Sequence, residues 1–141
     1  MDKEKRKQLI ETAKARGYVS MAPPRILVTR EEFFDGNDDE GSIGCNLIEH
    51  PGIAAFDAAF REVEGMDGVA GVYLAITEID ESYDSIWPFS DTACVVTRLP
   101  ASAFEPVLRP LKPDELALCQ ESFANHLEIP AGHQLIYVWW D

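Results

Sequence analysis

Apolar residues along the chain follow a helix period in one clear segment and strand-like patterns in several others. One stripe predicts a helix over 51–64, opened by Pro51 and ended by Gly65, because its members share one helix face: Ile53, Phe56, Phe60 and Val63. Runs of branched and aromatic residues predict strands over 25–29, 69–79, 90–99 and 134–140. Weaker stripes predict helices over 2–16, 101–108 and 113–127, and one helical turn over 30–34.

From residue 25 onward these elements run strand, helix, strand, strand, helical segment, strand. This is the split βαβ order of ferredoxin-like folds, with the first and third strands inside an antiparallel sheet. The third strand, 90–99, is apolar on both faces, as an interior strand should be. We therefore expect an α+β fold with helices mainly on one face of the sheet. A basic helix within 1–20 would precede this single α+β domain of residues 25–141.

Charge is distributed unevenly, with 12 Lys and Arg against 25 Asp and Glu. Residues 1–30 contain eight bases and three acids, so residues 31–141 keep four bases and 22 acids, a net charge of −18. A body this acidic repels nucleic acid and anionic membranes and attracts a basic partner, although negative charge also simply favours solubility.

The sequence also favours a cytoplasmic protein. No apolar run approaches the roughly 20 residues that span a bilayer, and the charged N-terminus lacks the apolar core of a signal peptide. The three cysteines are odd in number and widely spaced, which argues against a disulfide framework.

The acidic segment 35–46 has part of a calcium-binding spacing. Asp35, Asn37 and Asp39 occupy the first, third and fifth positions of an EF-hand-like loop. Glu40 stands at the sixth position, where the turn needs Gly, and Asn46 at the twelfth, where the cation needs a bidentate Glu. We interpret the segment as an Asx-rich turn, with calcium binding in another geometry as the alternative.

Signatures of catalysis and of cofactor binding are missing. Cys45 and His50 lie five residues apart, but no nucleophile motif surrounds Cys45. The cysteines and histidines lack zinc spacing, and no glycine-rich phosphate loop is present. We predict no catalytic residue, no metal and no cofactor. A small-ligand protein or enzyme stays open as an alternative, with a pocket between the 35–46 loop and the 87–91 segment and with Asp91 as its working carboxylate.

Four aromatic residues could serve either the core or an interface: Trp87, Phe89, Trp139 and Trp140. Adjacent residues on a strand point to opposite faces, so Trp139 and Trp140 cannot both face the helices. We expect at least two of the four to pack in the core. An aromatic side chain left on the open face would anchor a protein partner or a homodimer, because it buries much area at small entropy cost.

Several segments together resemble a family of small, acidic, uncharacterised bacterial proteins. The segments are 32–47 (EFFDGNDDEGSIGCNL), 50–52 (HPG), 87–91 (WPFSD) and 138–141 (VWWD). The resemblance runs from about residue 25 to the end and leaves the basic helix outside. It implies bacterial origin and a cytoplasmic location, and it carries no established activity.

These observations favour a binding protein over an enzyme, with a basic protein as its partner, as for an immunity protein that neutralises a nuclease toxin. Carboxylates within 35–40 and 80–84 would steer the partner, and Trp87 or a C-terminal Trp would anchor it. A self-associating domain without a ligand is a third hypothesis. The binding candidates are Asp35, Asn37, Asp38, Asp39, Asn46, Asp84, Trp87, Asp91, Trp139 and Trp140.

Overall fold

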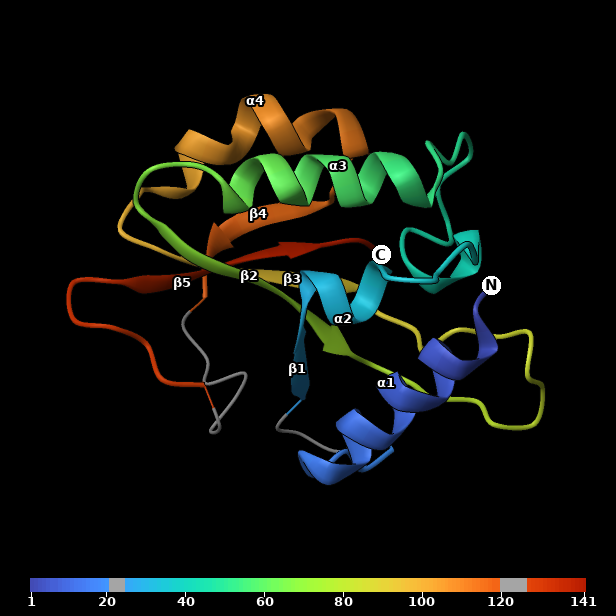
Figure 1. Ribbon diagram of the computed structural model, residues 1–141. Coiled ribbons are helices and arrows are strands. Elements are labelled where there is room, and N and C mark those ends of the chain that lie inside the picture. The colour runs from blue at the N-terminus through green and yellow to red at the C-terminus, as the bar shows by residue number, and fades with distance from the viewer. Residues whose placement is uncertain (21–24, 120–126) are drawn as a thin grey trace.

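The structure, a computed structural model, describes residues 1–20, 25–119 and 127–141. Five antiparallel strands form one sheet in the order β1-β2-β3-β5-β4 (Figure 1). The strands are β1 (Ile26–Thr29), β2 (Val69–Ile76), β3 (Thr92–Thr97), β4 (Glu115–Leu118) and β5 (Gln134–Trp139). The helices are α1 (Lys3–Ala15), α2 (Arg30–Phe34), α3 (Ile53–Glu64) and α4 (Glu105–Leu108), with 3-10 turns η1 (Glu40–Ser42), η2 (Ala101–Phe104) and η3 (Arg109–Leu111). The predicted α+β class and N-terminal helix are confirmed.

One face of the sheet carries the main core, and α3 and α4 lie side by side over it (Figure 1). One row of apolar side chains crosses all five strands in register: Val28, Leu74, Ala93, Val138 and Leu116. α3 buries the four residues of its predicted stripe: Ile53, Phe56, Phe60 and Val63. It begins two residues after Pro51, because Gly52 takes a φ of 96°, which is outside the helical region and suits glycine.

Trp140 joins the end of the sheet to α3. Its ring centroid lies 5.4 Å from that of Phe56 and 6.1 Å from that of Phe60, both in edge-on arrangements. Its indole N–H donates a hydrogen bond of 3.0 Å to the Leu111 carbonyl oxygen, so the buried donor is satisfied. With Trp87 also buried, at least two of the four aromatic residues pack in the core, as predicted.

The opposite face of the sheet holds a second, smaller apolar cluster: Leu27, Ala75, Cys94, Val96 and Leu135. Burial raises the pKa of the Cys94 thiol strongly, which keeps it protonated and unreactive. Trp139, the neighbour of Trp140 on the chain, is directed away from the main core and is only half-buried.

The split βαβ strand order is not present. β1 lies at one edge and pairs only with β2 among the described strands, whereas the prediction placed it inside the sheet. The interior strand β3 has β2 and β5 as its neighbours, which accounts for its apolar side chains on both faces. At the β1 edge, the Arg16 guanidinium donates to the Leu27 carbonyl oxygen at 3.3 Å. A side chain, rather than another strand, thus covers part of this edge.

The helix predicted over 113–127 is wrong for the part that the structure describes. Glu115–Leu118 is β4, and the N–H of Cys119 continues the pairing by donating to the Leu135 carbonyl oxygen. Glu, Leu and Ala are good helix formers, but pairing with β5 satisfies the same backbone groups and overrides that local preference. Residues 120–126 of the predicted helix lie outside the described residues.

The two adjacent tryptophans give a matched test of this fold. We expect Trp140→Ala to lower the free energy of unfolding by about 3–5 kcal/mol, because it removes a buried ring from the α3 contact. Trp139→Ala should cost about 1 kcal/mol, since that ring is half-exposed. Urea unfolding followed by circular dichroism measures both. Equal losses for the two variants would contradict the assignment of the two faces.

Candidate functional site

α1 is anchored by a small apolar stripe: Leu9, Ile10 and Ala13. Leu9 and Ala13 belong to the main core cluster, so the helix packs on the same core as the sheet. The helix begins at Asp2, whose side chain accepts hydrogen bonds from the N–H groups of Glu4 and Lys5. Beyond these contacts, the attachment of α1 is polar and uses cations on two flanks.

On one flank, α1 pairs with the acidic segment 31–40. Lys5 Nζ lies 2.6 Å from Asp35 Oδ1, and the N-terminal ammonium group lies 2.9 Å from Asp38 Oδ2. Just past the end of the helix, the two terminal nitrogens of Arg16 donate to the two carboxylate oxygens of Glu32, at 2.9 and 3.0 Å. Such a bidentate pair fixes geometry as well as charge.

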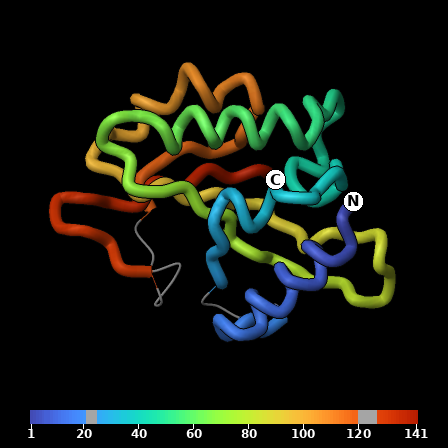
Figure 2. The backbone as a smooth tube through the Cα atoms, in the orientation of Figure 1, coloured from blue at the N-terminus to red at the C-terminus, as the bar shows by residue number. Residues whose placement is uncertain are grey.

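On the other flank, α1 pairs with segment 78–86. Lys3 Nζ lies 2.8 Å from Asp84 Oδ2, and Lys14 Nζ lies 2.8 Å from Glu81 Oε2. Figure 2 shows both acidic segments next to the helix, and we call residues 31–40 and 78–86 together the acidic clamp. The carboxylates that the sequence assigned to steering a partner therefore hold the chain's own basic helix.

Arg6 joins the helix to the backbone of the clamp. Its guanidinium group donates to three carbonyl oxygens, those of Asp80 (3.1 Å), Tyr83 (2.9 Å) and Ile86 (2.7 Å). The side chain is nearly fully buried. This one arginine therefore satisfies three backbone acceptors along the 80–86 connection.

Cations from the N-terminal segment lower the pKa values of two clamp carboxylates, Asp84 and Glu32, and the Ser82 backbone N–H lowers the pKa of a third, Asp80. The hydrogen bond from Lys3 lowers the pKa of Asp84. Burial alone would raise the pKa of Glu32, but hydrogen bonds from Arg16 and from the Thr29 backbone N–H outweigh it, and the pKa is lowered. The shifts at Asp84 and Glu32 favour the charged form, as expected for carboxylates beside cations.

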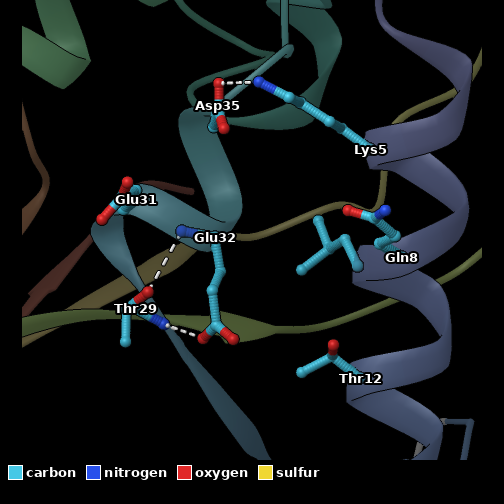
Figure 3. Close-up of a pocket in the computed structure, with 8 residues that line it drawn as sticks. Lys5, Gln8, Thr12, Thr29, Glu31, Glu32 and Asp35 are labelled. Atoms are coloured by element: carbon cyan, nitrogen blue, oxygen red, sulfur yellow. Dashed lines mark hydrogen bonds and ion pairs between the residues drawn. The ribbon is translucent and has the colours of Figure 1, made fainter.

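A polar cleft of about 280 Å³ lies between α1 and α2 (Figure 3). Lys5 and Asp35 meet across one end of it, and the Gln8 and Thr12 side chains point from α1 towards α2. Neither the Gln8 nor the Thr12 side chain has a hydrogen-bond partner among the described residues. The lining is completed by Leu9, Thr29, Glu31 and Glu32.

The 35–46 loop and the 87–91 segment do meet, as the pocket hypothesis required. They meet through two hydrogen bonds: the Asp39 side-chain atom Oδ2 accepts from the Trp87 N–H at 3.0 Å, and the Ser42 carbonyl oxygen accepts from the Ser90 N–H at 2.8 Å. The C-terminus joins them, since Asn46 Nδ2 donates to the carbonyl oxygen of Asp141 at 3.0 Å. The cleft described above shares only Asp35 with the residues predicted to bind.

Two residues of the calcium-like spacing, Asn37 and Asp39, make hydrogen bonds within the loop itself. Asn37 is buried, accepts from the Asp39 N–H at 2.9 Å and donates to Ser42 Oγ at 3.0 Å. Asp39 in turn is the N-cap of η1, and its side chain accepts from the Gly41 N–H at 2.9 Å. This is the Asx-rich turn that the sequence predicted. In the described part of the chain, no group of three or more His, Cys, Asp or Glu lies close enough to hold a metal ion.

Asp91 ties three strand ends together. Its Oδ1 atom accepts from Arg25 at 2.6 Å, from Thr92 Oγ1 at 2.8 Å and from Thr77 Oγ1 at 3.1 Å. Its carbonyl oxygen also accepts from the Trp140 N–H at 2.9 Å. These hydrogen bonds link the start of β1, the end of β2 and the start of β3, so Asp91 stabilises the sheet at this end.

The predicted aromatic anchors separate into buried and accessible residues. Trp87 and Trp140 are buried, so neither offers its ring to a partner. Trp139 is half-buried and remains the accessible one. The Trp87 indole N–H is the single buried side-chain nitrogen or oxygen without a hydrogen-bond partner in residues 1–20, 25–119 and 127–141.

Cys45 and His50 do not form a nucleophile pair. The His50 Nδ1 atom accepts from the Gly52 N–H at 2.9 Å, so its Nε2 atom carries the proton and donates to the Ile43 carbonyl oxygen at 2.7 Å. Both ring nitrogens are thus used by the backbone. Cys45 is exposed.

The sequence reasoning missed the cations of α1 as site residues, namely Lys3, Lys5, Arg6, Lys14 and Arg16. A signal was present: the first sixteen residues are basic, and the loops that flank them in space are acidic. Opposite charges in separate segments of one chain attract each other before they attract a partner.

Comparisons with known proteins add relatives but no activity. A family model described as the uncharacterized protein YfbO family matches residues 4–138, a span that includes nearly all of α1. The chain is similar to the uncharacterized protein YfbO of Escherichia coli (strain K12), with 32% identity over 124 residues, 84% of each chain. No solved structure matches it. None of the helices in the described ranges combines the length and apolarity needed to cross a membrane.

The Lys3–Asp84 pair gives a pH test of the clamp. Because the pKa of Asp84 is lowered on folding, its contribution is present above the ordinary Asp value of about 3.9 and is lost as the pH falls through the folded value. We expect the carboxyl ¹³C titration of Asp84 to have its midpoint below about 3.9.

In Lys3→Met, that midpoint should rise towards the ordinary value. Lys7→Met is the control, because Lys7 is exposed and has no ion-pair partner among the described residues. An unchanged Asp84 midpoint in Lys3→Met would contradict the contact.

Proposed function

The chain belongs to the uncharacterized YfbO family, and from its structure we propose that it is a protein-binding module whose acidic clamp recognises a basic partner. One observation carries the proposal. The clamp contains ten carboxylates and no Lys or Arg, whereas residues 1–16 oppose it with seven cationic groups, counting the N-terminal ammonium, and three carboxylates. The clamp and its helix together therefore keep a surplus of six negative charges.

Part of this surplus lies on accessible side chains of the clamp. Glu31, Glu40 and Glu78 are exposed, and none has a Lys or Arg within ion-pair distance among the described residues. Glu40 Oε1 lies 3.8 Å from Nδ1 of the His50 imidazole. Unpaired carboxylates at a rim raise the rate of encounter with a cationic surface and set its orientation.

An immunity-type protein is one form of this function, with a basic nuclease toxin as the partner. The acidity and the 32–47 and 87–91 motifs would then be features of the family. The same charge disfavours nucleic acid and anionic membranes as partners. We place this activity in the cytoplasm, where free thiols such as those of Cys45, Cys94 and Cys119 stay reduced.

Capture from a lysate of the source bacterium tests the function. The immobilised chain should retain a basic protein at about 50 mM salt and release it at about 500 mM, because exposed charges are screened. The triple variant Glu31→Gln, Glu40→Gln, Glu78→Gln should bind the retained protein about tenfold more weakly.

The control is a second triple variant of equal charge, Glu49→Gln, Glu62→Gln, Glu128→Gln. These residues are exposed, lie outside the clamp and have no ion-pair partner among the described residues. The proposal fails if no basic protein is retained in a salt-sensitive way, or if the two triple variants lose binding equally.

The polar cleft supports a second candidate function, the binding of a small primary amine. Its size is at the lower end for ligand sites, which suits a small molecule. Gln8, Thr12 and Glu31 offer it open acceptor atoms, and Lys5 already places an ammonium group against Asp35 there. An ammonium group has three donors and no acceptor, which matches this lining.

Titration of ¹⁵N-labelled protein with 1,4-diaminobutane tests the cleft. We expect saturable shifts of the Gln8, Thr12 and Glu31 amide resonances. Thr12→Val with Glu31→Gln should weaken them about tenfold, and Glu11→Gln, on the outer face of α1, should leave them unchanged. Shifts spread evenly over the acidic surface would show unspecific cation binding and remove this candidate.

A further inference from the structure

We propose that α1 is a displaceable occupant of the acidic clamp and that the partner inserts a basic amphipathic helix in its place. This inference rests on the proposed function and names the element of the partner that is recognised. Its basis is that the clamp already holds a helix of that kind, through ion pairs on both flanks.

The contacts of α1 define what the clamp recognises. Lys3 and Lys14 face segment 78–86, and Lys5 and Arg16 face segment 31–40. Each pair is eleven residues apart, which is three helical turns, or about 16 Å along the axis. The clamp therefore favours a helix that carries two rows of cationic side chains, with a narrow apolar stripe between the rows.

Arg6 adds a more specific requirement. The carbonyl oxygens of Asp80, Tyr83 and Ile86 converge on its guanidinium group. A lysine has three donors on a flexible stem and cannot reproduce the planar fork that reaches all three. A helix that replaces α1 must therefore bring an arginine one residue after the first cation of the 31–40 row.

The ion pairs between α1 and segment 78–86 are solvent-exposed. The Lys3 and Asp84 side chains are 67% and 71% exposed, and those of Lys14 and Glu81 are 51% and 56% exposed. Water and salt screen pairs of this kind, so each contributes little to retention. The apolar side chains that α1 buries are three, Leu9, Ile10 and Ala13.

The negative surplus of the clamp favours the exchange of α1 for a more basic helix. α1 carries two carboxylates of its own, Glu4 and Glu11, and both are exposed. A helix of the same pattern without these acids would meet the clamp with more attraction and less repulsion. The clamp is thus more acidic than its resident helix requires, and it favours a more basic one. α1 is covalently linked to the clamp, so its effective concentration there is high. A partner helix must bind the clamp with higher affinity than α1 does to replace it.

The test uses the full-length chain and a synthetic peptide of residues 1–18 labelled at its C-terminal end, which leaves the N-terminal ammonium free. In the variant Lys3→Glu, Lys14→Glu, α1 meets repulsion at Asp84 and Glu81. We expect this variant to bind the peptide at least about tenfold more tightly than the unmodified chain does, by fluorescence anisotropy at low salt. Lys7→Glu is the control on the same helix, and an Arg6→Ala peptide should bind at least about tenfold more weakly.

A second measurement covers the case in which the double variant does not fold. A peptide with Glu4→Lys and Glu11→Lys is added in excess to the unmodified ¹⁵N-labelled chain. The α1 amide resonances should move to the positions of a free peptide, while those of β2, β3 and β5 stay in place. Unmoved α1 resonances, or peptide binding that Arg6→Ala does not weaken, would overturn the inference.

The lysate experiment separates this inference from the function. If the Lys3→Glu, Lys14→Glu variant retains the basic protein no better than Lys7→Glu does, α1 is not exchanged and the inference fails, while the binding function stands. If neither variant nor the unmodified chain retains a basic protein, the proposed function itself fails.

Discussion

Repulsion between two acidic segments, relieved by a basic helix placed between them, is the constraint on which the N-terminal half of this structure depends. Segments 31–40 and 78–86 carry ten carboxylates without a single Lys or Arg, and both lie beside α1. Without the helix, like charges would meet in that space. α1 supplies cations to each segment and, through Arg6, a set of donors to the 80–86 backbone. α1 thus contacts both α2 and the connection before β3.

A second set of contacts fixes the other side of the acidic loop. Asp39 and Ser42 accept backbone hydrogen bonds from the 87–91 segment, and Asp91 accepts one from Trp140. The segments that carried the family resemblance thus meet one another and the C-terminus. Their side chains satisfy backbone groups and fill the core, with Trp87 buried. These motif residues therefore take part in holding the fold together.

The sequence predicted local structure well wherever one period dominated, as in α3, whose buried residues are those of its stripe. It failed where the outcome depends on pairing between distant segments. The 115–118 segment has helix-forming residues but pairs with β5, and β1 lies at an edge that strand patterns alone do not identify. The site shows the same division. Its carboxylates were recognised from charge, whereas their pairing with α1 depends on which loops the helix touches, and local patterns hold no information on that.

Two features of α1 act in opposite directions, and their balance decides whether the clamp can serve a partner. Leu9, Ala13 and Arg6 are buried, and they give the helix one defined position. The lysine pairs around them are exposed and weak, so the strength of attachment rests mainly on a few apolar side chains and one arginine. A clamp filled in this way is shielded from weakly basic surfaces, because these must compete with a tethered helix. It stays open to a helix that matches the arginine and exceeds α1 in charge, so the resident helix raises the selectivity of an otherwise general attraction.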